Sequence, residues 1–341
     1  MEAKSEVAFL PYVEGRRFQF GNAIFPQFYE PETQKLFAPE QLEYLKWYFG
    51  KYEDSAGNKL DSIVIVGIGQ RVLGPWSASE REEIRDSVLL LCLLSTWKVD
   101  AFFPLVPDNF KLFFKSFDSK DKTLAFRVGG YLRKTSIISG DMAESIRFVK
   151  PDTLANWDWV FEQSPWFKDQ AFFEGMSKAL ATGGKEEWFL RMVRASRVYS
   201  TSFQNIEELG YFDRILLIVT ALEILLNPAS QSGTEFARAL VKLIGIRNTT
   251  EYSNEINDRL LGFADAIYRI RSRYSHGNEL TETEAVHAEY GQFYRVALQT
   301  FGLACRYTLI DRGLVECTER DLQVYMDTKS GLFHLMEGTR S

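Results

Sequence analysis

The residues with the clearest capacity for chemistry lie close together near position 270. In the stretch "YRIRSRYSHGNEL" (268–280), four residues separate Arg271 from His276. Arginine offers a permanently charged, forked donor that fits phosphate, and histidine exchanges a proton near neutral pH. An imidazole beside a guanidinium is the smallest set that cleaves RNA without a metal. The ribose 2′-OH attacks the adjacent phosphorus, histidine moves a proton, and arginine neutralises the phosphorane.

The same residues also suit an ordinary helix end, because the helix dipole favours cations at its C-terminus. The spacing predicts a helix over 253–276 with one apolar stripe facing a core: Leu260, Phe263, Ile267, Ile270 and Tyr274. Arg271, Ser272 and His276 lie off this stripe. Ser272 and His276 are neighbours one turn apart, so we expect Ser272 to orient His276. Gly277 occupies a C-cap position, which places His276 in the final turn.

The rest of the C-terminal half is also predicted to be helical. Apolar spacing indicates further helices at about 185–204, 211–226, 234–245 and 282–311. The turns "NPASQSG" (227–233) and "GNELT" (277–281) separate them. The composition changes after "ATGGKEEW" (181–188), so we place the domain boundary near 180–184, a helical domain at about 185–315 and a tail at 316–341.

Residues 1–180 read as an α+β domain, although the chain as a whole is predominantly α. Alternating segments predict strands around a Gly-Asn turn ("RRFQFGNAIF"), and "EQLEYLKWYFGKY" predicts a helix. The glycines of "DSIVIVGIG" lack the spacing of a phosphate loop and predict a strand-end turn. Ser77 and Glu80 have capping-box spacing at the start of another helix. "LAFRVGGYLRK" predicts a hairpin, and "DMAESIRFV" a short helix.

The composition describes an ordinary globular chain of 341 residues with a net charge of −6, so an RNA partner would need a local basic patch. Three cysteines without a C-x-x-C pair indicate reduced thiols. The N-terminus does not resemble a signal peptide, and the apolar run 215–226 is too short to span a bilayer. We therefore expect a cytoplasmic protein without membrane contact. The three scattered histidines predict no metal or other cofactor.

Several other residues allow both a functional and a structural interpretation. Arg269 and Arg273 flank the motif, while Arg191, Arg194 and Arg197 follow three-residue steps along the first helix of the domain. These arginines form either an RNA-binding strip or a solvated helix face.

Three tryptophans in 151–167 form either a base-stacking platform or, as we favour, ordinary packing. Glu223, inside an apolar helix, is either a site residue or, as we favour, the partner of an interior arginine such as Arg238. His287 is expected at the surface, and His334 carries no signal.

The motif "IYRIRSRYSHG" (267–277) resembles the Apea-like branch of the HEPN superfamily, whose signature is an Arg followed after four to six residues by His. Three further blocks are similar: "FDRILLIVTALEILLNP" (212–228), "EFARALVKLIG" (235–245) and the long last helix. The resemblance covers about 187–315. Where that family commonly has Asn, Asp or His after the Arg, this chain has Ser272, which can still hydrogen-bond His276 or phosphate.

The resemblance implies an up-and-down helical bundle that forms a homodimer, with two Arg-His motifs lining one cleft. It implies a metal-independent endoribonuclease that leaves 2′,3′-cyclic phosphate ends, in a toxin or antiviral-defence context. Arg271, Ser272 and His276 would be catalytic, and Arg269, Arg273, Asn278, Arg191 and Arg194 would bind RNA. Asn278 replaces a Tyr that one toxin branch modifies, so that regulation is not expected.

The alternative is a non-catalytic HEPN module that binds RNA or a protein partner, or only dimerises. For the nuclease, we expect the 1–180 domain to sense a trigger, to select or target RNA, or to hold the enzyme in check, with a regulatory protein as a further partner.

Overall fold

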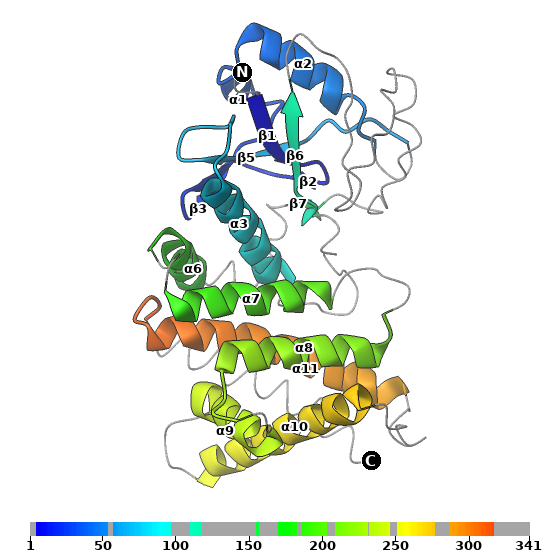
Figure 1. Ribbon diagram of the computed structural model, residues 1–341, viewed down its shortest axis with the longest axis vertical. Helices are drawn as coiled ribbons and strands as arrows, with labels where there is room; N and C mark the ends of the chain where they lie inside the picture. Colours follow the sequence, from blue (N-terminus) through cyan, green and yellow to red (C-terminus); the bar gives the residue numbers. More distant parts are fainter. Residues whose placement is uncertain are drawn as a thin grey trace. The chain divides into compact units, whose positions relative to one another are not determined.

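The computed structural model describes residues 5–53, 57–96, 110–117, 155–156, 170–182, 184, 186–202, 209–230, 232–245, 251–276 and 287–316. This part of the chain is predominantly helical and carries an antiparallel sheet near the N-terminus, as the α+β prediction requires (Figure 1). The predicted hairpin in "LAFRVGGYLRK", the predicted helix in "DMAESIRFV" and the tryptophans of 151–167 lie outside the described residues.

The described chain divides into two compact units. The first holds the described residues up to Val88, together with 110–117 and 155–156. The second holds those from Leu89 to Thr96 and from 170 onward. The helix α6 (Gln170–Thr182) therefore belongs to the second unit, whereas the boundary drawn from sequence at 180–184 places it in the first.

The first unit is built on a five-stranded sheet in the order β3-β4-β5-β1-β6. Its strands are β1 (Ser5–Leu10), β3 (Phe18–Phe20), β4 (Ala23–Phe25), β5 (Val64–Ile68) and β6 (Phe113–Phe117). Every neighbouring pair is antiparallel. A separate short parallel pair joins β2 (Val13–Glu14) to β7 (Ala155–Asn156). The predicted Gly-Asn turn joins β3 to β4, with Gly21 at a φ of 62°, a conformation that glycine adopts without strain.

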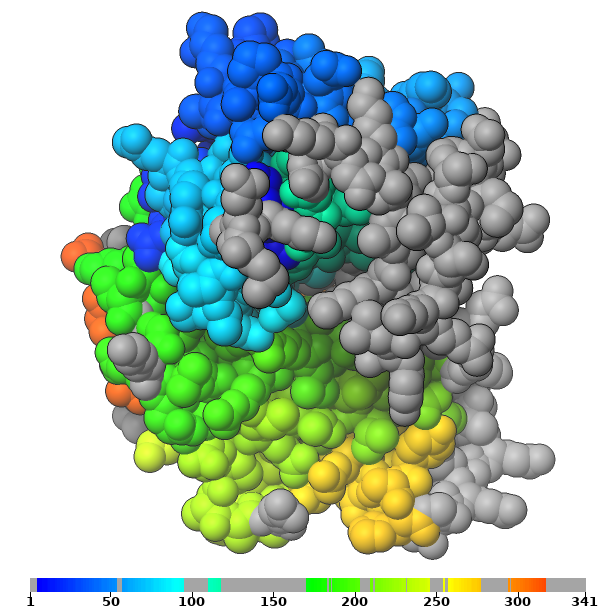
Figure 2. Space-filling view, turned by 45° about the horizontal axis from the view of Figure 1, so that its top comes forward, coloured from blue at the N-terminus to red at the C-terminus, as the bar shows by residue number. Residues whose placement is uncertain are grey.

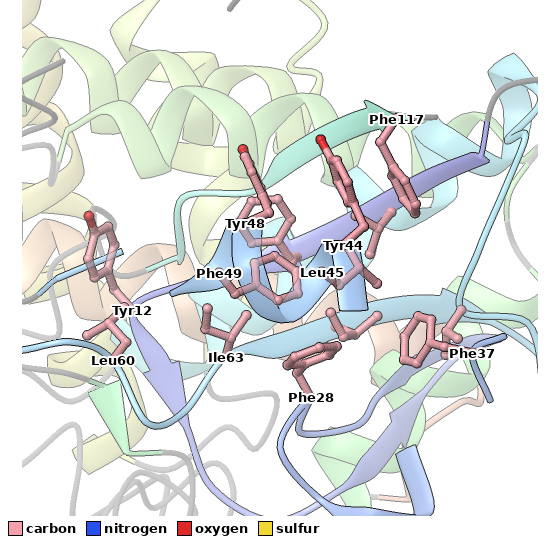
Figure 3. Close-up of a cluster of buried hydrophobic side chains, with 14 of the residues drawn as sticks. Tyr12, Phe28, Phe37, Tyr44, Leu45, Tyr48, Phe49, Leu60, Ile63 and Phe117 are labelled. Atoms are coloured by element: carbon pink, nitrogen blue, oxygen red, sulfur yellow. The ribbon is translucent and has the colours of Figure 1, made fainter. Parts of the chain in front are cut away.

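The helices of the first unit are α1 (Pro31–Gln34), α2 (Pro39–Phe49) and the N-terminal part of α3 (Ala78–Thr96). Aromatic side chains of α2 form the core with the sheet (Figure 3). Tyr44 stacks on Phe117 of β6 at 4.7 Å, and Phe49 lies 4.9 Å from Phe9 of β1. These large rings bury much apolar surface in a small unit, which explains the aromatic spacing of "EQLEYLKWYFGKY".

A predicted capping box and a predicted turn of the first unit are confirmed. At the start of α3, the Ser77 N–H donates to Glu80 at 2.7 Å and the Glu80 N–H donates to the Ser77 hydroxyl at 3.2 Å, which is the expected capping box. Gly69 follows β5 at a φ of 61°, so the Gly-Ile-Gly segment forms a strand-end turn.

The second unit consists of helices, and the five predicted ones are found within a few residues: α7 (Glu187–Thr201), α8 (Tyr211–Leu226), α9 (Gly233–Ile244), α10 (Glu251–Ser275) and α11 (His287–Asp311). α8 packs against α7, α9, α10 and α11, so it lies in the middle of the unit (Figure 1). Its residues Ile215, Ile218 and Leu222 are fully buried. No described helix is long and apolar enough to cross a membrane.

A close backbone approach packs α6 against Leu314 and Val315, which follow α11. A Cβ atom at Gly175 would lie 2.4 Å from Val315 Cγ2 and 2.9 Å from the Leu314 carbonyl oxygen. Gly175→Ala should therefore destabilise the protein by about 1–3 kcal/mol, because the carbonyl cannot move aside as a flexible side chain could. Urea unfolding measures this loss.

Gly262 is the matched control, because a Cβ atom at this exposed position of helix α10 meets nothing within 4 Å. Gly262→Ala should stabilise the protein by about 0.5–1 kcal/mol through helix propensity. Equal stabilisation by both substitutions would show that α6 does not pack against α11 this closely.

Candidate functional site

The C-terminal part of α10 runs antiparallel to α8, and this pairing builds the candidate site. Arg271 contacts Glu223 near the end of α8, and Tyr274 contacts Asp213 near its start. The later residue of α10 thus meets the earlier residue of α8. This part of α10, gold in Figure 2, lies at the surface in that view.

Arg271 is held on two sides. Its Nη2 lies 3.1 Å from Glu223 Oε2, and its guanidinium lies over the Tyr268 ring at 5.5 Å. Its Nε is buried without a hydrogen-bond partner among the described residues. The side chain is 27% exposed. The guanidinium is therefore fixed in position while part of it faces solvent, where its remaining N–H groups can donate to an anion.

Glu223 forms an ion pair with a different arginine from the one predicted. The expectation that its carboxylate is matched by an arginine is confirmed, but its partner is Arg271, whereas Arg238 pairs with Glu235 at 2.8 Å. A glutamate inside an apolar helix predicts an ion pair, and the structure leaves its carboxylate only 14% exposed. The spacing along the chain did not show which arginine it meets.

Burial is the main influence on the Glu223 carboxyl and raises its pKa above the usual 4.5. The charge of Arg271 and a hydrogen bond with Tyr268 act in the opposite direction. The folded protein therefore binds this proton more tightly than the unfolded chain. The resulting stabilisation is complete below pH 4.5 and is lost as the pH rises through the folded-state pKa.

Glu223→Gln should remove this pH dependence, because an amide does not titrate. The quantity to compare is the free energy of unfolding of the wild type minus that of Glu223→Gln. This difference should fall as the pH rises from 4.5 through the raised pKa, by up to about 1.4 kcal/mol per pH unit. It should be level at higher pH. Urea unfolding from pH 4 to 7.5 measures the difference, and a difference that increases with pH would contradict the raised pKa.

His276 lies just beyond α10 and is exposed. Its backbone N–H donates to the carbonyls of Ser272 and Arg273, each at 3.2 Å, so the helical turn continues to this residue. No hydrogen bond joins the imidazole to another described residue. Ser272 is half-buried. Its carbonyl accepts hydrogen bonds from the His276 N–H and the Ser275 hydroxyl, and the orienting role of its own hydroxyl stays a prediction.

Tyr274 anchors this last turn to α8. Its hydroxyl donates to Asp213 Oδ1 at 2.8 Å, and its ring stacks on Phe212 with centroids 5.8 Å apart and planes at 23°. The hydrogen bond to Asp213 raises the pKa of Tyr274. Asp213 is itself fixed, because its other oxygen accepts the N–H of Gly210 at 2.9 Å at the N-terminus of α8.

Tyr274 also corrects the predicted apolar stripe. Leu260, Phe263, Ile267 and Ile270 are buried as predicted, but Tyr274 is 37% exposed. The helix extends past the core at this point, and the hydroxyl bonds a polar partner near the surface.

The other predicted site residues are placed as follows. Arg269 is exposed and pairs with Asp265 at 3.2 Å, and Arg273 is exposed. On α7, Arg191 is half-buried and Arg194 is exposed, and no described interaction joins either of them to Arg271. Arg197 on the same helix is exposed. His287 is the first residue of α11, while Asn278 and His334 lie outside the described residues.

Other catalytic groups are scarce in the described part of the chain. It holds no group of three His, Cys, Asp or Glu residues that could bind a metal. Its two cysteines, Cys92 and Cys305, are buried and are not joined in a disulfide. Burial raises the pKa of the Cys305 thiol, which makes it a poor nucleophile.

Comparison with known proteins gives no significant match to a protein-family model, a curated protein or a solved structure.

Proposed function

We propose that the helical domain at about 185–315 is a HEPN-type, metal-independent endoribonuclease. The observation that carries the proposal is the fixed position of Arg271. The Glu223 carboxylate and the Tyr268 ring hold its guanidinium partly exposed, and His276 follows on the same helix end. A fixed guanidinium pays little entropy to bind a phosphate, and the exposed imidazole is accessible to a polymer substrate.

The proposed reaction uses only the RNA and protein side chains. The 2′-oxygen attacks the adjacent phosphorus, and the imidazole of one His276 accepts the 2′-OH proton. Arg271 stabilises the charge on the phosphorane oxygens. The bond from phosphorus to the 5′-oxygen then breaks, and an imidazolium supplies the proton to that leaving oxygen. The products are a 2′,3′-cyclic phosphate and a free 5′-hydroxyl.

A homodimer solves the problem of two simultaneous proton transfers. One imidazole cannot be base and acid in the same step, whereas two copies related by a two-fold axis supply both. We therefore propose a second copy of this chain as partner, with the two α10 ends facing one cleft.

Glu223 is assigned a positioning role in this proposal. A lone arginine side chain samples many rotamers, and the ion pair at 3.1 Å removes most of that freedom before RNA binds. The carboxylate does not reach the reacting atoms in this assignment but acts through Arg271.

The cellular setting is part of the same proposal. We place the nuclease in the cytoplasm, in a toxin or antiviral-defence role, with the N-terminal unit or a regulatory protein controlling it. RNA is the substrate, and Arg269 and Arg273, both exposed near the motif, add local positive charge to an acidic protein.

The substrate side of the proposal is tested with 5′-labelled mixed-sequence and structured RNAs in EDTA. We expect cleavage by the purified protein, and complete resistance at any mapped site where a single 2′-deoxynucleotide removes the attacking hydroxyl. Cleavage 3′ to a 2′-deoxynucleotide would rule out the proposed reaction.

A non-catalytic RNA-binding module is the second candidate. It is favoured by the state of the two key side chains: Arg271 already has a counter-ion, and the imidazole of His276 has no hydrogen-bond partner among the described residues. Such a module would bind the same RNAs without cleaving them, and His276→Ala would change its affinity only slightly.

A further inference from the structure

We infer that Tyr274 is a stacking platform for an unpaired base, so that the domain binds single-stranded RNA beside Arg271 and His276. The inference rests on the proposed RNA-binding function and specifies its substrate: a strand whose bases are free of pairing. It does not depend on whether the protein cleaves that strand.

The exposure of Tyr274 is unusual for an aromatic residue of this protein. Three large hydrophobic side chains are exposed among the described residues: Leu36, Leu261 and Tyr274. Tyr274 is the aromatic member of the three, and it lies between the two residues proposed to perform the chemistry. A part-exposed ring offers a flat apolar face on which a nucleic-acid base can stack.

The ring is also held rigid. The Tyr274 hydroxyl donates a hydrogen bond to Asp213 Oδ1 at 2.8 Å. The Phe212 ring stacks on the Tyr274 ring with centroids 5.8 Å apart and planes at 23°. Asp213 is in turn fixed by the Gly210 N–H. A ring restrained at its hydroxyl and supported by a second ring has lost its rotamer freedom before a ligand arrives. A base can therefore stack on it at little entropic cost.

The charges around the ring suit a nucleic acid. Arg273 precedes Tyr274 and is exposed. Arg271, paired with Glu223, lies one turn before it with a part-exposed guanidinium, and Arg269, paired with Asp265, is 66% exposed. An aromatic face beside guanidiniums is the combination that binds single strands, because the ring takes the base and the cations take the backbone. A duplex keeps its base faces covered, so a paired strand could not use this surface.

The test separates the base from the backbone. Binding is measured in EDTA on a His276→Ala background, so that no RNA is cleaved, with three labelled probes. These are a single-stranded decamer of adenylate, a decamer of the same ribose-phosphate backbone without bases, and a ten-base-pair RNA duplex. Each probe is titrated with protein that carries Tyr274, Tyr274→Phe or Tyr274→Leu.

We expect Tyr274→Leu to weaken binding of the adenylate decamer by about tenfold, and to leave binding of the base-free decamer unchanged. Tyr274→Phe keeps the ring and its support by Phe212 but loses the hydrogen bond to Asp213, so it should bind the adenylate decamer more tightly than Tyr274→Leu and leave binding of the base-free decamer unchanged. The duplex should bind more weakly than the single strand, with no dependence on residue 274. Leucine keeps an apolar side chain without a ring face, and matching circular dichroism and thermal unfolding of the three proteins exclude a folding defect.

The outcomes distinguish the two proposals. Equal losses on the adenylate and base-free decamers, or no loss on either, would overturn the platform while leaving the nuclease proposal intact. The expected base-dependent loss, in a protein whose His276 form never cleaves RNA, would support the platform and overturn the nuclease. Absence of binding to every probe would overturn both.

Discussion

Replacing His276 by alanine should reduce the rate of RNA cleavage by about 10²–10⁴-fold, the usual contribution of a general acid or base. The imidazole is exposed and has no hydrogen-bond partner among the described residues, so its loss should change the free energy of unfolding by less than about 0.5 kcal/mol. Single-turnover cleavage with labelled RNA measures the rate, and urea unfolding measures the stability.

Free imidazole provides a sharp control for this variant. Because the truncated side chain leaves an exposed position, added imidazole should restore part of the lost rate. The restored rate should increase with the concentration of neutral imidazole if the missing group is the base, and with that of imidazolium if it is the acid. His334→Ala, which replaces a histidine of the C-terminal tail, should cleave at the wild-type rate. Full activity of His276→Ala would exclude this residue from the reaction.

Replacing Arg271 by alanine should have two effects, on cleavage and on stability. Loss of the guanidinium should lower the cleavage rate by about 10²–10³-fold, as for other groups that stabilise a transition-state charge. It should also leave the Glu223 carboxylate, 14% exposed, without its counter-ion. Breaking a buried pair costs about 3–5 kcal/mol, and the 27% exposure of Arg271 reduces our expectation to roughly 1–3 kcal/mol.

Arg271→Lys separates the two effects. Lysine keeps the charge opposite Glu223 but lacks the planar fork, so the free energy of unfolding should stay closer to that of the wild type while the rate falls at least tenfold. Arg238→Ala is the matched control, because it removes an exposed arginine that pairs with Glu235 three residues away. It should change stability by less than about 0.5 kcal/mol and leave cleavage unchanged. Wild-type cleavage by Arg271→Lys would show that the planar fork is not needed, and wild-type cleavage by Arg271→Ala would leave Arg271 with a structural role alone.

The helices of the second unit follow from local pattern. Apolar residues at spacings of three and four predict α8 and α10, and the turn residues between them stop each helix within a few residues of the observed end. The capping box of Ser77 and Glu80 is likewise local, since both partners lie within one turn. These features need no knowledge of tertiary structure.

Features set by tertiary contacts could not be predicted in this way. The pairing of Glu223 with Arg271 depends on the antiparallel packing of two helices, and Arg238 was an equally good partner on sequence grounds. Tyr274 continues the apolar period of α10, yet its exposure depends on where α8 begins. The identity of a contacting residue forty or more positions away is not encoded in a helical period.

The measurement that tests the central claim most directly is the chemistry of the product ends. Wild type, His276→Ala and Arg271→Ala are incubated in EDTA with the same single-stranded RNAs, and each new 3′ end is identified by mass spectrometry. We expect 2′,3′-cyclic phosphates at the sites that the wild type cuts, and at least 10²-fold less of these products from either variant. Wild-type products that end in a 3′-hydroxyl, or the same sites cut equally by all three proteins, would contradict it.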